Sequence, residues 1–202
     1  MKKHVIATYS SKENGIIEVV KGRTGYSIVV DEIAQSGPDL EVLWEEAFTK
    51  LLSDVPLKKI LILGFGAGSV MKPLRRYWPE STVAAVEIDQ TMIKIARTYF
   101  PENLREVNLS KRDGFKYIVS LEKKISFDLV IVDCYIGDSE PGDMKTLSFL
   151  QNLKKISHRV LLNQLFLPDK KTELHKIEFL KALDNIYPVK ALKLPFNIII
   201  SY

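Results

Sequence analysis

The first quarter of the chain carries two short β-branched runs, followed by apolar positions with helical spacing. Gly15 to Lys21 and Tyr26 to Asp31 flank Gly22 to Gly25, whose two glycines tolerate positive φ, so this pattern predicts a β-hairpin. After Ser-Gly-Pro at 36–38, one amphipathic helix is predicted by the apolar residues Leu40, Leu43, Trp44, Ala47, Phe48, Leu51 and Leu52. We therefore expect an N-terminal β-hairpin extension at residues 1–37 and a second domain at residues 38–202.

Beyond position 58 the chain alternates between short apolar runs and helical stretches. Five runs are strand candidates: Lys59 to Leu63, Thr82 to Val86, Glu106 to Leu109, Phe127 to Val132 and Arg159 to Leu165. Because an amphipathic segment follows each of the first four, the pattern predicts a parallel sheet covered by helices. Only Pro195 separates Val189 to Leu194 from Phe196 to Ser201, so these two strands must pair antiparallel. The expected fold class is α/β, with a mostly parallel sheet and an antiparallel last strand.

Composition and charge narrow the class of protein. The 202 residues are 46% hydrophobic and 27% charged, as in a globular protein, and the net charge of +4 is spread over scattered basic pairs, which indicates no nucleic-acid partner. The single cysteine, Cys134, excludes an internal disulfide framework, and three isolated histidines offer no metal-ligand spacing. The early apolar stretch breaks between Thr8 and Glu13, too soon for an export signal or a membrane span. We expect a cytoplasmic protein with no metal ion and no membrane partner.

A glycine-rich loop follows the first strand of the expected parallel sheet. Gly64 permits a tight turn, while Gly66 and Gly68 allow backbone N–H groups to approach a ligand. Glu87, 23 residues after Gly64, stands where an acidic side chain accepts both ribose hydroxyls of an adenosine ligand. At the third strand end, Asp113 offers an acceptor for an adenine amino group. The structural alternatives are close packing for the loop, a solvent-facing strand end for Glu87 and a helix cap for Asp113.

The spacing of the glycines distinguishes between two nucleotide ligands. A dinucleotide-binding loop has its third small residue where Ser69 stands, close to the pyrophosphate, whereas the third glycine here is Gly68. A Gly-x-Gly-x-Gly loop suits a ligand without a pyrophosphate. We therefore expect S-adenosylmethionine rather than NAD.

These residues resemble a known group of proteins, the spermidine synthase-like branch of the class I S-adenosylmethionine-dependent methyltransferase superfamily. The segments that carry the resemblance are Gly64 to Ser69, Val86 to Asp89, Ile93 to Pro101 and Asp113 to Phe115. Upstream, Val30 to Gln35 precedes Trp44 to Glu46 at the spacing of two family motifs. The resemblance spans about residues 15 to 135. It implies a seven-stranded Rossmann-like sheet, and the habit of the family favours a homodimer.

The resemblance also implies which residues bind the adenosyl ligand. By analogy with the family, Glu87 holds the ribose and Asp113 holds the adenine amino group. Ile88 and Gly114, the next residues along the chain, belong to the same binding site. The methionine part of the ligand is lined by the loop glycines Gly64, Gly66 and Gly68.

Asp133, after the fourth strand, matches the general base proposed for the family, and a loop-capping carboxylate is its structural alternative. Gln35, Glu46 and Tyr135 are the candidates for contact with the acceptor substrate. Each has a plainer alternative, since acidic residues are common on helix surfaces and a tyrosine can simply pack. The neighbouring Cys134 lacks the preceding proline of cysteine-nucleophile methyltransferases, which favours a small buried side chain over a nucleophile.

Two departures from the family decide which reaction the sequence predicts. Ala67 replaces an aspartate that lies near the amine of decarboxylated S-adenosylmethionine, and Ile136 replaces one that binds the diamine. Both changes argue against aminopropyl transfer to putrescine. We therefore expect a methyltransferase that uses S-adenosylmethionine and a small-molecule acceptor, with amines among the candidates. A polyamine aminopropyltransferase using the decarboxylated donor and a non-catalytic nucleoside-binding protein are the alternatives.

Overall fold

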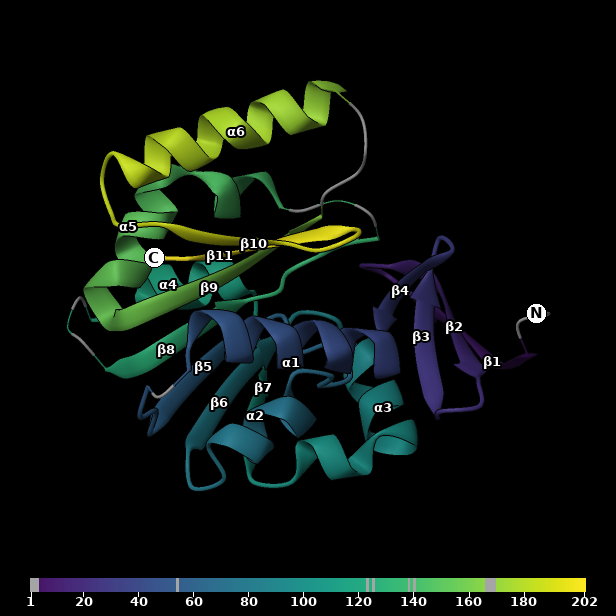
Figure 1. The fold of residues 1–202 in the computed structure, drawn as a ribbon. Helices are drawn as coiled ribbons and strands as arrows, with labels where there is room; N and C mark the ends of the chain where they lie inside the picture. The colour runs from purple at the N-terminus through teal and green to yellow at the C-terminus, as the bar shows by residue number, and fades with distance from the viewer. Residues whose placement is uncertain are drawn as a thin grey trace.

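The core of the fold is one seven-stranded sheet. The computed structural model describes residues 4–53, 55–122, 124, 126–137, 139, 141–165 and 170–202, without the side chains of residues 145 and 170–176. The strand order is β10-β11-β9-β8-β5-β6-β7 (Figure 1). Its parallel strands are β5 (Lys59–Leu63), β6 (Thr82–Glu87), β7 (Val107–Lys111), β8 (Phe127–Val132) and β9 (Ser157–Leu165). β11 (Asn197–Ser201) runs antiparallel to β9, and β10 (Lys190–Lys193) antiparallel to β11. The predicted α/β fold is confirmed.

Helices cover both faces of this sheet. α1 (Pro38–Leu51) and α2 (Met71–Tyr77) pack on one face, and the other face is covered by α4 (Gly114–Ser120), α5 (Leu147–Ile156) and α6 (Lys170–Asp184). Successive side chains of β5 point to opposite faces of the sheet: Ile60 packs in the cluster with α1 and α2, and Leu61 packs in the cluster with α4 and α5. Strands buried on both faces are continuous apolar runs, which is why the sequence located them. Among the described residues, no helix combines the length and the apolar character needed to cross a membrane.

The N-terminal part is a four-stranded antiparallel sheet, larger than the predicted hairpin. Its strands are β1 (His4–Ser11), β2 (Gly15–Lys21), β3 (Tyr26–Val30) and β4 (Ile33–Ser36), in that order across the sheet. The predicted hairpin corresponds to β2 and β3. β4 follows β3 through a two-residue turn in which Asp31 and Glu32 both have positive φ, with Val30 paired to Ile33. Glycine or asparagine usually fills such a turn, so Asp31 and Glu32 do not indicate one from the sequence alone.

This N-terminal sheet packs against α3 (Gln90–Tyr99), which is followed by the short helix η1 (Pro101–Leu104). Figure 1 shows the four purple strands beside α3 and the first turn of α1. Ser11 and Asn14 donate hydrogen bonds to Oδ2 of the buried Asp89, at 2.6 and 2.7 Å. The other oxygen of Asp89 caps α3 by accepting from the backbone of Thr91 and Met92. One buried carboxylate thus fixes the N-terminal sheet next to the end of β6.

Candidate active site

A cavity of about 1010 Å³ lies at the carboxyl edge of the seven-stranded sheet, under β4 and α1. It lies where the strand order reverses between β5 and β8, the usual ligand position in open α/β sheets. Most of the predicted site residues line it: Gln35, Glu46, Gly64, Gly66, Glu87, Ile88, Asp113, Gly114, Asp133 and Tyr135. Gly68 does not line the cavity. The structure thus brings together residues from β4, from α1 and from the carboxyl ends of β5, β6, β7 and β8.

The loop after β5 needs its glycines for different reasons. Gly64, Gly66 and Gly68 all have positive φ, at 79°, 55° and 75°. A Cβ on Gly64 would overlap the backbone carbonyl of Asp133, so this glycine allows the loops after β5 and β8 to meet. A Cβ on Gly68 would lie 2.6 Å from the ring of Phe65 and 2.9 Å from Cβ of Asn103. Gly68 therefore serves the packing of the loop, the structural alternative for this position.

Glu87 is buried at the end of β6 and holds the glycine loop. Its Oε2 accepts a hydrogen bond from the backbone N–H of Gly66 at 2.8 Å, and its Oε1 accepts from that of Asp89 at 2.9 Å. Burial raises the pKa of Glu87, and the bonds from these N–H groups oppose the rise. Because each carboxylate oxygen has two lone pairs, Glu87 keeps acceptor capacity for a diol in the cavity.

Asp113 combines the two roles that the sequence left open. Its Oδ1 caps α4 by accepting from the backbone N–H of Lys116 at 3.0 Å, and its side chain also lines the cavity. Gly114 is buried next to it, where a Cβ would lie 3.1 Å from the methyl of Met144. Ile88 lines the cavity one residue after Glu87. These residues line the part of the cavity at the ends of β6 and β7.

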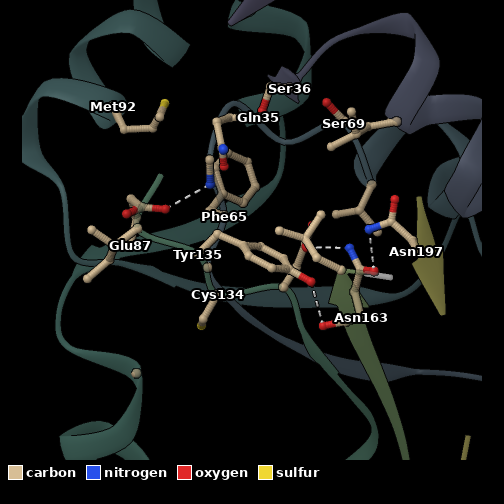
Figure 2. Close-up of a pocket in the computed structure, with 18 of the residues that line it drawn as sticks. Gln35, Ser36, Phe65, Ser69, Glu87, Met92, Cys134, Tyr135, Asn163 and Asn197 are labelled. Carbon is tan, nitrogen blue, oxygen red and sulfur yellow. Dashed lines mark hydrogen bonds between the residues drawn. The ribbon is translucent and has the colours of Figure 1, made fainter. Parts of the chain in front are cut away.

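Asp133 stands at the end of β8 and belongs to a chain of side-chain hydrogen bonds that continues through Asn163 to Asn197, both labelled in Figure 2. Its Oδ1 accepts from Nδ2 of Asn163 at 2.8 Å, and Oδ1 of Asn163 accepts from Nδ2 of Asn197 at 2.9 Å. Burial raises the pKa of Asp133 to about 6, while Asn163 and the indole of Trp44 act in the opposite direction. The indole N–H is buried without a hydrogen-bond partner but lies near enough to lower this pKa. Asp133 is therefore a carboxylate poised to exchange a proton near neutral pH.

The remaining candidates surround the space next to Asp133. Figure 2 shows Tyr135 between Glu87 on one side and the pair Asn163 and Asn197 on the other. The Tyr135 hydroxyl donates to the backbone carbonyl of Asn163 at 2.8 Å. Gln35 donates to the carbonyl of Gly137 at 2.8 Å, which ties β4 to the loop after β8.

Two further residues, Glu46 and Cys134, complete this part of the cavity. Glu46 lies exposed on α1 at its edge, and Cys134 lines its wall. Burial raises the pKa of the Cys134 thiol well above its ordinary value, which keeps it protonated and weakly nucleophilic. Sequence reasoning missed Asn163 and Asn197, although an asparagine near the carboxyl end of an apolar strand was a usable signal.

Acidic residues dominate the charge of the cavity. The carboxylates that line it are Glu32, Asp39, Glu46, Glu87, Asp113, Asp133 and Asp143. The lysine and arginine residues among the described lining are Arg112 and Lys116, both exposed. A cavity with this balance favours a cationic ligand over an anionic one.

Comparison with known proteins places the chain in a family. The model of the spermine/spermidine synthase domain matches residues 28–197. The chain belongs to the spermine/spermidine synthase family. This confirms the resemblance found in the sequence.

Individual relatives in the spermine/spermidine synthase family are distant. A polyamine aminopropyltransferase of Sulfurisphaera tokodaii is 29% identical over 170 residues, which cover 79% of this chain and 56% of that protein. One of Methanocaldococcus jannaschii is 30% identical over 121 residues, or 54% of this chain and 39% of that protein. A solved structure, a probable spermidine synthase from Corynebacterium glutamicum, has a TM-score of 0.75 at 18% identity and covers 96% of this chain and 78% of its own. The chain thus spans between 39% and 56% of the length of these two curated relatives.

These comparisons contradict the predicted methyl transfer from S-adenosylmethionine, because the relatives are named as aminopropyltransferases. That prediction relied on Ala67 and Ile136, which stand where the family has aspartates. The structure shows why Ala67 misled: its side chain is fully buried in the cluster between the N-terminal sheet and α3, away from the cavity lining. An alanine there reports on packing rather than on the charge of the cavity, which remains strongly acidic.

Proposed function

We propose that this chain transfers the aminopropyl group of decarboxylated S-adenosylmethionine to an amine acceptor. The observation that carries the proposal is the acid-lined cavity in a chain of the spermine/spermidine synthase family. The donor carries a sulfonium and an ammonium, and the acceptor is an amine, so both bind as cations. An excess of carboxylates attracts them and repels the additional carboxylate of intact S-adenosylmethionine.

The donor occupies the half of the cavity over β5, β6 and β7. Glu87 accepts the ribose hydroxyls with the lone pairs that its backbone contacts leave over. Asp113 accepts from the adenine amino group, and Ile88 and Gly114 flank the adenine ring. Gly66 lines the route from the ribose toward Asp133. A volume of about 1010 Å³ accommodates a nucleoside together with a second small molecule.

Asp133 is the proton acceptor of the proposed reaction. When bound, the donor supplies a carbon next to its sulfonium sulfur, which a nucleophile attacks with departure of a neutral thioether. Asp133 first takes a proton from the bound acceptor ammonium, which frees the nitrogen lone pair for attack, and later releases this proton to water. The nitrogen–carbon bond then forms as the carbon–sulfur bond breaks, and the electron pair of the broken bond stays on the thioether sulfur. A pKa of about 6 keeps Asp133 ionised at neutral pH, and Asn163 fixes the direction of its Oδ1. Gln35, Tyr135 and Glu46 surround the acceptor.

The donor preference tests this proposal directly. Calorimetry should give a dissociation constant for decarboxylated S-adenosylmethionine at least about tenfold below that for the intact donor, a difference of about 1.4 kcal/mol. Incubation with the decarboxylated donor and a panel of amines should yield an aminopropylated amine detectable by mass spectrometry. Tighter binding of the intact donor would count against the proposal.

Glu87→Gln is expected to weaken donor binding by about 10- to 100-fold, because an amide offers one acceptor oxygen where the carboxylate offers two charged ones. The glutamine oxygen can still accept from Gly66, but the N–H of Asp89 then loses its acceptor, so thermal unfolding of the variant must accompany the binding measurement. Calorimetry with the donor measures the effect, and Glu80→Gln, an exposed change outside the cavity, is the matched control. Equal affinities in the two variants would remove Glu87 from the ribose site.

A further inference from the structure

The cavity has a second half, over the ends of β8 and β9 and the β10–β11 hairpin, and its lining differs in character from the donor half. The sheet order places this half on the opposite side of the β5–β8 boundary from Glu87 and Asp113. Beyond Asp133, the described residues that these strands contribute are uncharged, among them Ile136, Leu165, Leu194 and Phe196. The far end of an acceptor bound at Asp133 therefore meets an apolar wall.

Three exposed apolar residues of the described chain, Val42, Ile136 and Phe196, line this cavity. Val42 and Phe196 are the two most exposed large hydrophobic residues described, at 67% and 65%, and both line this cavity from α1 and from the β10–β11 hairpin. Ile136 is 41% exposed and also lines it. Apolar side chains held open to solvent around a cavity are typical of a ligand surface, because burial by a ligand removes their area from water.

A diamine acceptor carries a second ammonium, and Ile136 stands where the resemblance places the aspartate that binds it. The acids near this apolar wall are poorly placed to take over that role. Glu32, Asp39 and Glu46 lie on the opposing segments and Asp143 lies after β8, and all four are exposed. Ion pairs that remain in contact with water contribute little free energy. An ammonium held against Ile136 and Phe196 would lose hydration without a buried carboxylate beside it among the described residues. The surface next to Asp133 thus favours an uncharged far end.

We propose that the acceptor is a monoamine with an apolar substituent, an alkylamine or aralkylamine, rather than a linear diamine. Its amino group lies at Asp133, and its apolar part packs on Ile136, Phe196 and Val42. This inference rests on the proposed function for the identity of the reaction, but its binding surface can be measured without turnover.

Two amines of nearly equal shape test the inference. Hexylamine and 1,5-diaminopentane differ in a terminal methyl against a terminal ammonium. Calorimetry on the full chain saturated with methylthioadenosine should show hexylamine binding at least tenfold more tightly. Ile136→Asp should reverse this preference, and Phe196→Ala should weaken hexylamine at least fivefold while changing the diamine less. Val119→Ala, on an exposed residue of α4 outside the cavity, should change neither affinity.

If 1,5-diaminopentane bound the wild-type chain as tightly as hexylamine or more tightly, the inference would be overturned. If Glu46→Gln then lost affinity for the diamine, Glu46 would be the residue that binds its second ammonium. An aminopropyl transfer assay separates this inference from the proposed function. Transfer to 1,5-diaminopentane but not to hexylamine would refute the apolar acceptor and keep aminopropyl transfer. Tighter hexylamine binding with no transfer to either amine would refute the reaction and keep the apolar acceptor surface.

Discussion

Asp133→Asn is expected to lower kcat/KM for aminopropyl transfer by about 100-fold or more, the usual contribution of a positioned general base. The amide can still accept the hydrogen bond from Asn163, so the geometry persists while the proton acceptor is lost. In the wild type, kcat/KM should fall as the pH drops through about 6, where Asp133 becomes protonated. A pH profile of both proteins measures this, and an unchanged acidic limb in the variant would assign the limb to another group.

The same substitution should make the protein more stable at neutral pH. Burial raises the pKa of Asp133 from an ordinary value of 3.8 to about 6, so the folded protein binds this proton more tightly than the unfolded chain does. The stability of the wild type therefore declines as the pH rises from about 4 to about 6, and the cost of the buried charge persists above that window. Removing the charge should add about 1 to 3 kcal/mol at pH 7.5, or roughly 2 to 10 °C in Tm, and nearly nothing at pH 4.

Thermal unfolding of wild type and Asp133→Asn at these two pH values checks the prediction. Asp128→Asn is an informative control, because hydrogen bonds from the backbone of Lys58 and Lys59 lower the pKa of Asp128 despite partial burial. Neutralising it should decrease stability at neutral pH. A variant at position 133 that is less stable than wild type at pH 7.5 would mean that the carboxylate supports the fold rather than costs it.

The parts of the fold that the sequence predicted are those governed by burial. Strands β5, β6, β8 and β9 contribute side chains to both helical layers, so their apolar runs are clear in the sequence. β1 was missed because most of its side chains are exposed, with Ala7 and Tyr9 only partly covered. α6 was missed because its apolar positions repeat weakly, although Leu183 packs fully into the core. The apolar periodicity of a strand or helix is weak wherever only a few of its side chains contact the core.

Some residues of the candidate site could likewise be predicted from the sequence, and others could not. Glu87, Asp113 and Asp133 were found because each directly ends or follows a strand, and position along the chain then gives position at the sheet edge. The bond between Asn163 and Asn197 joins residues 34 positions apart and exists because β11 lies next to β9 in a particular register. The charge of the cavity also depends on which side chains face it. Whether residue 67 contributes to that charge could therefore not be decided before the fold was known.

Gly64→Ala should be the most damaging small substitution in the chain. At φ +79° an alanine is strained, and its Cβ would overlap the backbone carbonyl of Asp133 and lie 2.7 Å from the carbonyl carbon. Neither group is a flexible side-chain end, so the loop after β5 or the loop after β8 must shift. We expect a loss of more than about 3 kcal/mol in the free energy of unfolding, measured by urea denaturation, because overpacking adds to positive-φ strain.

Gly15→Ala separates these two causes. Gly15 also has positive φ, at 64°, but nothing lies within 4 Å of the position a Cβ would occupy. This variant should therefore lose only about 1 to 2 kcal/mol, the cost of the backbone conformation alone. The difference between the two variants reports the contact between the loops after β5 and β8, and donor affinity should decline in Gly64→Ala alone, since both loops line the cavity. Similar losses in both would show that the two loops move apart readily, and Asp133 would then lack the rigid support that a positioned proton acceptor needs.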